Sequence, residues 1–513
     1  MSLRPDGSDL RIIGYYLGKV AAGLSLMMAL PAVIALVLGE WNSATALLAG
    51  AAIAFGVGQV TEWRLRTRAS LTWAHGTVVV ALAWLLGSVL AAVPLFLSGH
   101  FSDFLDAWFD AMSGLTTSGL SVIQDLDHLS YSMSFYRHLT HFAGGQGIVI
   151  VVLALLTAGG ASVGTLYVAE GRDERLVPSV VRTARFIFLI ASVYLVVGTL
   201  ALLGAMWTAG IGGWRGLGHA VNLFFAAFDT GGFAPTSQSV GYYHSITVEL
   251  VLTVLMVAGT MSFALHYALW NRRYGEVARN TEVRSLALTV VALTALALYG
   301  LATSGAYAEA SGLFRKGFFT VISAHSGTGF GVASGTLFLS DWGVLAPSAI
   351  VIAMALGGMA GSTAGGIKAI RIGVTFTGLV QDIRRLLLPE SALSVASYHS
   401  GRRRVLRSEV LRSSTAILLL YAVTYLSGGL IGLLYGEWDI TATLFESVSA
   451  AANVGLSVGI VDPNMPRGLQ VTYIAQMWLG RLEFVAAFAM VAYGVSLLSG
   501  RRVRLRSARR HRT

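Results

Sequence analysis

Four short segments of the chain carry residues suited to hold a monovalent cation. Each is too short to cross a membrane, which takes about 20 apolar residues, and each ends in a small polar turn that contains glycine. The segments are 109–121 (FDAMSGLTTSGLS), 222–234 (NLFFAAFDTGGFA), 319–331 (FTVISAHSGTGFG) and 445–457 (FESVSAAANVGLS). Glycine lets backbone carbonyls point inward without a Cβ clash, and a ring of carbonyls can replace the hydration shell of a cation. The predicted chemistry is cation coordination by backbone oxygens.

The four segments align without a gap. Their glycines Gly119, Gly232, Gly329 and Gly455 share one column, and Leu or Phe follows each of them. One such turn would be read as an ordinary loop. Four in register, each before an apolar span, indicate an internal repeat of span, re-entrant helix, glycine turn and span. Irregular backbone at membrane depth is tolerated where it is buried or lines a watery path.

The composition of the chain indicates where these segments are placed. Of its 513 residues, 55% are hydrophobic and 12% are charged, about half the charged fraction of a soluble domain. This excludes a disordered protein, a coiled coil and an ordinary soluble enzyme, and favours a polytopic membrane protein. With no cysteine, disulfides, thiolate metal sites and cysteine nucleophiles are excluded. The N-terminus lacks a cleavable signal pattern.

Apolar stretches long enough to span predict an all-α fold with ten membrane helices. They lie at 14–39, 44–62, 71–98, 136–158, 185–209, 247–270, 283–303, 343–366, 413–435 and 470–498. None shows the alternating polarity of barrel strands. The first two precede the repeats, so we expect four span–re-entrant helix–span units around one pore plus two extra N-terminal spans.

The repeat pattern predicts the domain organisation. Its parts are 1–65 (two N-terminal membrane helices), 66–165 (repeat 1), 166–275 (repeat 2), 276–385 (repeat 3, with a broken last helix), 386–499 (repeat 4) and 500–513 (a basic tail).

The 36 Lys and Arg residues outnumber the 26 Asp and Glu residues, and their placement predicts topology. Arginine runs, among them Arg172 and Arg175, follow even-numbered spans and fill the tail, so the positive-inside rule puts them and both termini in the cytoplasm. This explains the net charge of +10 without a nucleic-acid partner. The loop 371–412 is denser in arginine than topology needs, and it is a candidate docking surface for a cytoplasmic partner.

The span 343–366 is interrupted by glycines at a density that breaks a helix. The segment 357–368 contains Gly357, Gly358, Gly361, Ser362, Thr363, Gly365, Gly366 and Lys368. Broken helices at membrane depth tend to line ion paths, so we interpret it as a flexible loop below the glycine turns that acts as a gate. The alternative is close helix packing through small residues.

Arg481 lies inside the last apolar span, where a charge costs at least about 2.5–3.5 kcal/mol and normally faces a cavity or a partner. The hypothesis is a positive barrier below the turns that works with the gate loop, and the alternative is a structural ion pair. Glu483 is two residues away and does not share its helix face, so a different partner is expected.

Two further polar residues have open interpretations. Asp229, directly before the second turn, either raises the local cation concentration or is a carboxylate held behind the turn by hydrogen bonds. His266 is interpreted as a hydrogen-bonding core histidine in preference to a proton relay.

Together these residues resemble the TrkH/KtrB family of bacterial potassium uptake subunits, related to fungal Trk and plant HKT transporters. The resemblance covers nearly the whole chain and rests on AMSGLTTSGL (111–120), DTGGF (229–233), GGMAGSTAGGIKAIRI (357–372), ESVSAAANVGLSVG (446–459) and MWLGRLE (477–483). It implies a potassium-permeable pore in a bacterial cytoplasmic membrane. It also implies a homodimer that works with a cytoplasmic RCK-type nucleotide-binding subunit such as TrkA.

The resemblance also implies a potassium-binding selectivity filter. Its residues would be Thr117, Ser118, Gly119, Thr230, Gly231, Gly232, Gly327, Thr328, Gly329, Asn453, Val454 and Gly455. Glycine at 119 favours potassium, since serine there accompanies sodium permeation in plant relatives. Gly327 and Asn453 depart from the threonine of the first two turns, which implies an asymmetric filter.

Other function classes fit the sequence less well. A proton- or sodium-coupled symporter would need buried carboxylates within spans, and the spans offer few. A sodium-permeable HKT-like transporter is a further alternative. An intramembrane enzyme would need a catalytic cluster, and HEXXH, GxSxG and Walker A patterns are absent. Potassium is therefore expected as the transported ion, without an organic cofactor, and any nucleotide control would come from a partner.

Overall fold

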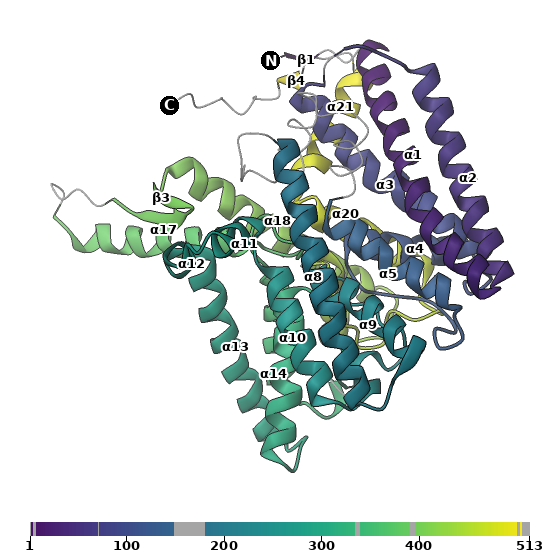
Figure 1. Ribbon diagram of the computed structural model, residues 1–513. Helices are drawn as coiled ribbons and strands as arrows, with labels where there is room; N and C mark the ends of the chain where they lie inside the picture. The colour runs from purple at the N-terminus through teal and green to yellow at the C-terminus, as the bar shows by residue number, and fades with distance from the viewer. Residues whose placement is uncertain are drawn as a thin grey trace.

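The computed structural model describes residues 2–3, 7–69, 71–147, 180–333, 339–389, 395–499 and 503–504. The end of the fourth predicted span (148–158), Arg172, Arg175 and most of the basic tail lie outside the described residues. Two short strands, β1 (Ser2–Leu3) and β4 (Val503–Arg504), pair antiparallel and bring the two ends of the chain together (Figure 1).

An N-terminal helical hairpin precedes the repeats, as expected. It consists of α1 (Gly7–Leu38) and α2 (Trp41–Arg64). Between them, the carboxylate of Glu40 accepts the backbone N–H groups of Tyr131 and Ser132 at 2.9 Å each. These are the first residues of α5 (Tyr131–Gly145), so Glu40 satisfies free helix N–H groups and complements the helix dipole. The hairpin is thereby fixed to the first repeat.

The four repeats share one order of elements. The first spans are α3 (Trp73–Leu97), α8 (Val180–Thr208), α13 (Thr281–Ser304) and α18 (Ser408–Leu433). The short helices are α4 (Phe104–Thr116), α9 (Gly213–Phe228), α14 (Ala310–Ser326) and α19 (Ile440–Ala451). The second spans begin with α5, α10 (Ile246–Thr260), α16 (Leu345–Ala355) and α20 (Arg467–Arg481). The fold class predicted from the sequence is confirmed.

The repeats form a closed ring because each second span also packs against the short helix of the next repeat. The pairs are α5 with α9, α10 with α14, α16 with α19 and α20 with α4. Two of these contacts include ion pairs: Glu249 of α10 with Arg315 of α14 at 2.6 Å, and Arg467 of α20 with Asp103, which caps α4. The last of the four pairings joins the end of the chain to its first repeat.

Two spans predicted as continuous helices are broken. The stretch 247–270 bends by 103° between α10 and α11 (Phe263–Trp270), and 470–498 bends by 108° between α20 and α21 (Val485–Ser499). The hydroxyl of Ser262 caps the new helix start at α11, and Glu483 and Phe484 take left-handed backbone dihedrals in the second break. Within the described residues, six helices are long and apolar enough to span, or up to eight with the bent pairs.

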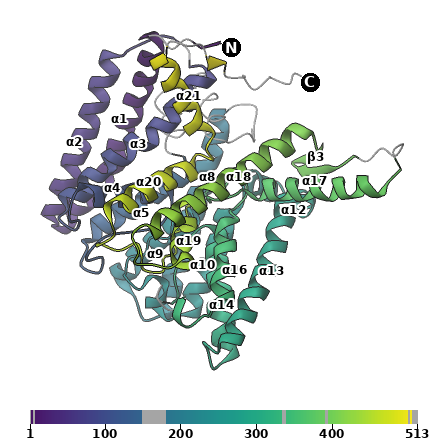
Figure 2. The same ribbon diagram turned by 180° about the vertical axis from the view of Figure 1, so that it is seen from behind.

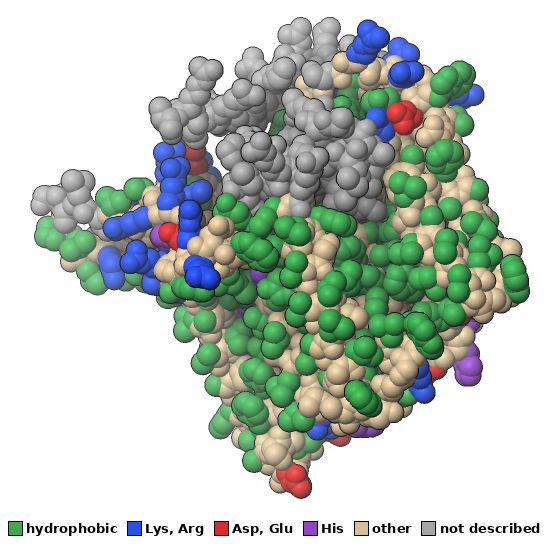
Figure 3. Space-filling view, in the orientation of Figure 1, with side chains coloured by type: hydrophobic (Ala, Val, Ile, Leu, Met, Phe, Trp, Pro, Cys, Tyr) green, Lys and Arg blue, Asp and Glu red, His purple; other side chains and the backbone are tan. Residues whose placement is uncertain are grey.

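The described residues of the arginine-rich segment 371–412 form an arm with secondary structure of its own. It contains α17 (Ala369–Leu387) and the hairpin of β2 (Ser397–Ser400) and β3 (Arg402–Val405). The arm projects from the body on the side opposite α1 and α2 (Figures 1 and 2). Blue Lys and Arg side chains gather on it, whereas hydrophobic side chains cover much of the body in that view (Figure 3). A short helix, α12 (Tyr274–Arg279), lies at its base, where Glu276 is 2.9 Å from His399 of β2.

Candidate functional site

The four glycine turns have the same backbone conformation. The first predicted filter residue of each is left-handed: φ is 57° at Thr117, 51° at Thr230, 74° at Gly327 and 55° at Asn453. Two residues later the glycines of the shared column are again at positive φ, between 78° at Gly232 and 98° at Gly455. Non-glycine residues rarely adopt such dihedrals. The repetition read from the residues is therefore also a repetition of backbone geometry.

The turns contact one another in a ring. A Cβ added to Gly119 would overlap the carbonyl oxygen of Gly231 in the second turn. The same relation holds from the second turn to the third, from the third to the fourth, and from the fourth back to the first. The remaining pairs are Gly232 with Thr328, Gly329 with Val454 and Gly455 with Ser118. Because only a residue without a side chain fits at each junction, the glycines let the four turns close around one axis.

Side chains of the predicted filter residues point away from the ring and brace it. Asn453 donates through Nδ2 to the Ser118 hydroxyl (2.8 Å) and to the carbonyl of Met477 (2.9 Å), which links the fourth turn to the first. Ser118 also shares a hydrogen bond with Thr116, at 2.8 Å. The shorter side chain of a threonine at 453 could not reach both of these acceptors.

A cavity of about 600 Å³ opens on the side of the ring where the glycines of the shared column lie. All four glycines of the shared column line it, together with Ser121 and Ser457. The C-terminal ends of the four short helices converge on the turns, so their partial negative charges face the axis. A cavity that ends at inward backbone oxygens is suited to receive a cation and remove its water.

The segment 357–368 lies on the other side of the ring and is irregular, as predicted. Backbone hydrogen bonds join the two ends of the segment: the N–H of Gly357 donates to the carbonyl of Ile367 (3.0 Å), and the N–H of Ala369 donates to the carbonyl of Gly358 (2.9 Å). Its interior contacts the second turn: the Thr363 hydroxyl lies 3.2 Å from the Thr230 hydroxyl, and 3.0 and 2.9 Å from the carbonyl oxygens of Phe228 and Gly259. The segment is therefore not helical, although its glycines also pack closely on neighbouring backbone, as the alternative of close packing through small residues expects.

Other predicted gate residues hold the loop in place. A Cβ on Gly365 would overlap the carbonyl of Ala452, next to the fourth turn, and Lys368 donates its Nζ to the carbonyl of Ala364 within the loop. The Ser362 hydroxyl donates to the carbonyl of Met359 at 2.7 Å. Gly361 and Gly366 take positive φ of 72° and 67° at its bends.

Arg481 joins the loop to the ring. It ends α20, and its Nη1 donates to the Thr117 hydroxyl (3.1 Å) and to the carbonyl of Thr363 (2.8 Å). Its Nη2 donates to the carbonyl of Gly144 (2.7 Å). Glu483 instead pairs with Arg371 of α17, so the expectation that these two neighbours have different partners is confirmed.

The two open interpretations can now be compared with the geometry. Gln146 donates through Nε2 to Asp229 Oδ1 (2.7 Å), and Asp229 is fully buried and does not line the cavity. One carboxylate oxygen is thus held behind the turn by a hydrogen bond, whereas Oδ2 has no hydrogen-bond partner in the part of the chain that the structure describes. The Nε2 of His266 lies 2.9 Å from the carbonyl of Ala258 at the break before α11, which fits a hydrogen-bonding core histidine.

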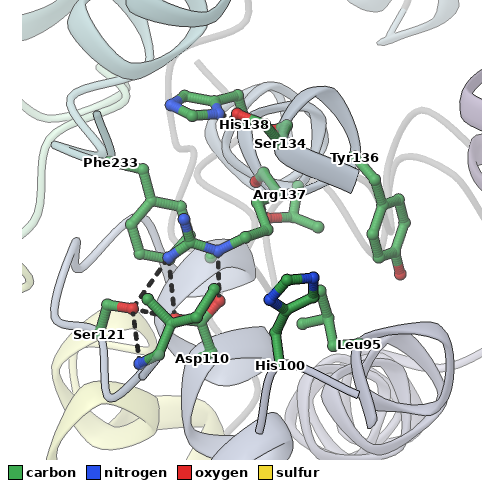
Figure 4. A network of polar contacts seen from close by, with 12 residues as sticks. Leu95, His100, Asp110, Ser121, Ser134, Tyr136, Arg137, His138 and Phe233 are labelled. Carbon is green, nitrogen blue, oxygen red and sulfur yellow. Dashed lines mark hydrogen bonds and ion pairs between the residues drawn. The ribbon is translucent and has the colours of Figure 1, made fainter. Parts of the chain in front are cut away.

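Sequence reasoning missed a buried polar cluster beside the first two turns (Figure 4). Arg137 of α5 donates to both carboxylate oxygens of Asp110 in α4, at 2.7 and 2.9 Å, and to the Ser121 hydroxyl at 2.9 Å. Both charged side chains are almost fully buried. An arginine at the start of the predicted span 136–158 was the available signal, because a charge at membrane depth requires a partner.

Fold and site together define a class: a multi-pass membrane protein with four span–short helix–span repeats that place glycine turns around a central pathway. Residues 43–493 match the TrkH family, described as cation transport proteins. The match covers most of the chain, and the protein belongs to this family.

Individual relatives agree with this assignment. The chain is 29% identical to the Trk system potassium uptake protein TrkH of Salmonella typhimurium, over 92% of this chain and 96% of that protein. It is 28% identical to an uncharacterised cation transporter of Methanocaldococcus jannaschii, over 94% of this chain and 96% of the relative. The crystal structure of the potassium transporter TrkH from Vibrio parahaemolyticus has the same fold, with a TM-score of 0.77, 24% identity, and coverage of 93% of this chain and 98% of that one.

Proposed function

We propose that this protein takes up potassium ions across the cytoplasmic membrane through a pore lined by the four glycine turns. The observation that carries the proposal is the closed ring in which each glycine of the shared column meets a carbonyl of the neighbouring turn. Relatives named as potassium uptake proteins support potassium as the ion.

In this proposal, residues 117–119, 230–232, 327–329 and 453–455 form the selectivity filter. Their carbonyl oxygens replace the hydration shell of the ion. The turns differ in sequence, with Gly327 and Asn453 in place of the two threonines, so we expect fewer well-ordered ion sites than in a symmetric filter. Uptake is driven by the membrane potential, which supplies about 2.3 kcal/mol per charge at 100 mV.

Passage is gated below the filter by the loop 357–368 and Arg481. A guanidinium that bonds to both the first turn and the Thr363 carbonyl puts a positive charge next to the ion path, and a positive charge repels a cation there. Opening requires that these hydrogen bonds break and that the loop moves aside.

Replacement of Arg481 by alanine tests this gate. We expect Arg481→Ala to raise potassium flux about tenfold or more in proteoliposomes, because removing hydrogen bonds to a charged group is worth about 1.5–3 kcal/mol. Arg467→Ala is the matched control: it removes an arginine at the other end of the same helix, where the partner is Asp103. Equal flux in Arg481→Ala and the parent protein would exclude the barrier role.

Regulation and assembly complete the proposal. Control comes from a cytoplasmic RCK-type nucleotide-binding subunit that docks on the arginine-rich arm, and two copies of the chain form a homodimer with both termini in the cytoplasm. Arg402, Arg403 and Arg404 are exposed on β3 and offer the positive surface for docking. The Trk system named for the relatives supports a partner subunit.

Coupled symport is the competing function, and three of the described carboxylates argue against it, whereas the buried Asp229 and Glu446 form no ion pair among the described contacts. Asp110, Glu249 and Glu483 each pair with an arginine, and a paired carboxylate is a poor carrier of protons. The deciding experiment is rescue of a potassium-uptake-deficient bacterium at low external potassium, with Gly119→Ser expressed in parallel. We expect the parent chain to restore growth and Gly119→Ser to fail or to admit sodium. If neither rescues although both reach the membrane, potassium uptake is the wrong assignment.

A further inference from the structure

The side chain that follows the second filter glycine is held from two sides. Phe233 lies with its ring centroid 4.1 Å from the guanidinium carbon of Arg137 and 4.2 Å from the ring centroid of His141. Both partners come from α5 of the first repeat, one helical turn apart on the same face. The second turn is thus fixed by a helix of the preceding repeat.

His141 also contacts the backbone on both sides of this junction. Its Nε2 accepts the backbone N–H of Phe233 (3.3 Å), and its Nδ1 lies 2.8 Å from the carbonyl of Gly114 in α4. The ring is fully buried, and it lies so close to Gly231 that a Cβ there would overlap it. With both nitrogens in use, one neutral tautomer fits: the N–H is on Nδ1 and the acceptor is Nε2.

Hydrogen bonds fix the guanidinium of Arg137, so the Phe233 ring packs against a group that cannot easily move. The guanidinium is bidentate to Asp110 and also donates to Ser121, two residues after Gly119 of the first turn (Figure 4). A bidentate pair fixes the plane of the guanidinium, and a cation above an aromatic face adds attraction. Arg137 therefore ties the outer ends of the first and second turns together.

The other three turns lack this arrangement among the described residues. The equivalents of Phe233 are Leu120, Phe330 and Leu456. Phe330 is equally buried, but the described contacts give its ring no guanidinium or imidazole partner. The filter is therefore braced unevenly, and most strongly between the first and second turns.

We propose that Arg137, His141 and Phe233 form a clamp that sets the width of the filter at this junction and so contributes to discrimination between potassium and sodium. These are positioning residues, since their side chains act through the backbone of residues 231–233. The inference rests on the proposed potassium pathway. Carbonyls that are held apart suit the larger ion, whereas a turn free to move inward can also coordinate the smaller one.

The test compares matched substitutions in proteoliposomes, with the ratio of potassium to sodium flux as the readout. Phe233→Leu introduces the residue that two other turns carry, and Phe330→Leu is its control in a turn without the clamp. His141→Leu removes the acceptor for the Phe233 N–H, whereas His141→Gln keeps a polar side chain of similar reach. We expect Phe233→Leu and His141→Leu to lower the flux ratio about fivefold, in line with the loss of one net hydrogen bond. Phe330→Leu and His141→Gln should stay near the parent value.

The outcomes separate the clamp from the function on which it rests. A parent protein without potassium flux would overturn the proposed function. A selective parent whose four variants are all equally selective would overturn the clamp alone. If Phe233→Leu does not reach the membrane, the His141 pair decides, because leucine and glutamine are close in volume and differ in hydrogen bonding. A loss of total flux at constant ratio would show a structural role and would also overturn the clamp.

Discussion

The first and fourth repeats place a carboxylate at the same point of their short helices and satisfy it differently. Asp110 and Glu446 are each nine residues before the glycine of their turn, and each accepts a hydrogen bond from a serine hydroxyl just after that turn, Ser121 or Ser457. Asp110 is paired with Arg137. Glu446 instead accepts backbone N–H groups of Val458 (2.8 Å) and Ile460 (3.3 Å).

The residue that faces each carboxylate explains the difference. Arg137 precedes Gly144 by seven residues, and Tyr473 precedes Gly480 by the same number; these glycines pack against the short helix of their own repeat. Tyrosine therefore stands in the fourth repeat where arginine stands in the first. A common position thus tolerates two solutions: an ion pair that engages both oxygens of Asp110, or a set of donors that all reach Oε1 of Glu446 and leave Oε2 without a hydrogen-bond partner among the described residues.

The largest expected effect comes from breaking the ion pair on one side. Arg137→Met should lower the free energy of unfolding by about 3–5 kcal/mol, because it leaves Asp110 buried without its cation. The double variant Asp110→Asn with Arg137→Met should recover most of this loss. Thermal unfolding of the purified protein in detergent measures both. If the double variant is as unstable as the single one, the pair is not what stabilises the first repeat.

Part of this arrangement could be predicted from the sequence. The glycine column, the short helices and the irregular segment 357–368 follow from local composition, and the expectation of a separate partner for Arg481 follows from helix geometry alone. The breaks at 261–262 and 482–484 were missed because apolar runs on both sides read as one span. Ser262 was the local signal for the first break, since a serine hydroxyl can cap a new helix.

The clamp and the ring could not be predicted, because they depend on contacts between distant segments. Arg137 meets Asp110 only once α5 packs on α4, and it meets Phe233 only once the second turn lies beside the first. Likewise, alignment identifies the glycines, whereas the carbonyl that each one faces depends on the order of repeats around the axis. Periodicity and composition carry no information on that order.

A medium effect is expected from Glu446→Gln, which tests the backbone solution of the fourth repeat. Glutamine keeps one oxygen for the amides of Val458 and Ile460, so we expect a loss of about 1–2 kcal/mol in unfolding free energy. Asp110→Asn should cost more, since it leaves Arg137 buried and unpaired. Both are measured by thermal unfolding in detergent. A loss for Glu446→Gln as large as that for Arg137→Met would mean that Glu446 has a cation partner after all, and the contrast between the repeats would fail.

The smallest effect is expected from Ser121 and Ser457, whose hydroxyls donate to the two carboxylates. The informative quantity here is whether their effects on the unfolding free energy are additive with those of the Asp110 and Arg137 substitutions. Ser121→Ala and Ser457→Ala should each cost about 1 kcal/mol, because each carboxylate keeps two N–H donors. Ser121 also accepts from Arg137, so its cost should fall when it is combined with the Asp110→Asn, Arg137→Met pair. Ser457→Ala should instead add to that pair without coupling, since its hydroxyl donates to Glu446 in another repeat. Unfolding measurements on this double-mutant cycle that gave equal coupling for both serines would show that the first and fourth repeats are not independent.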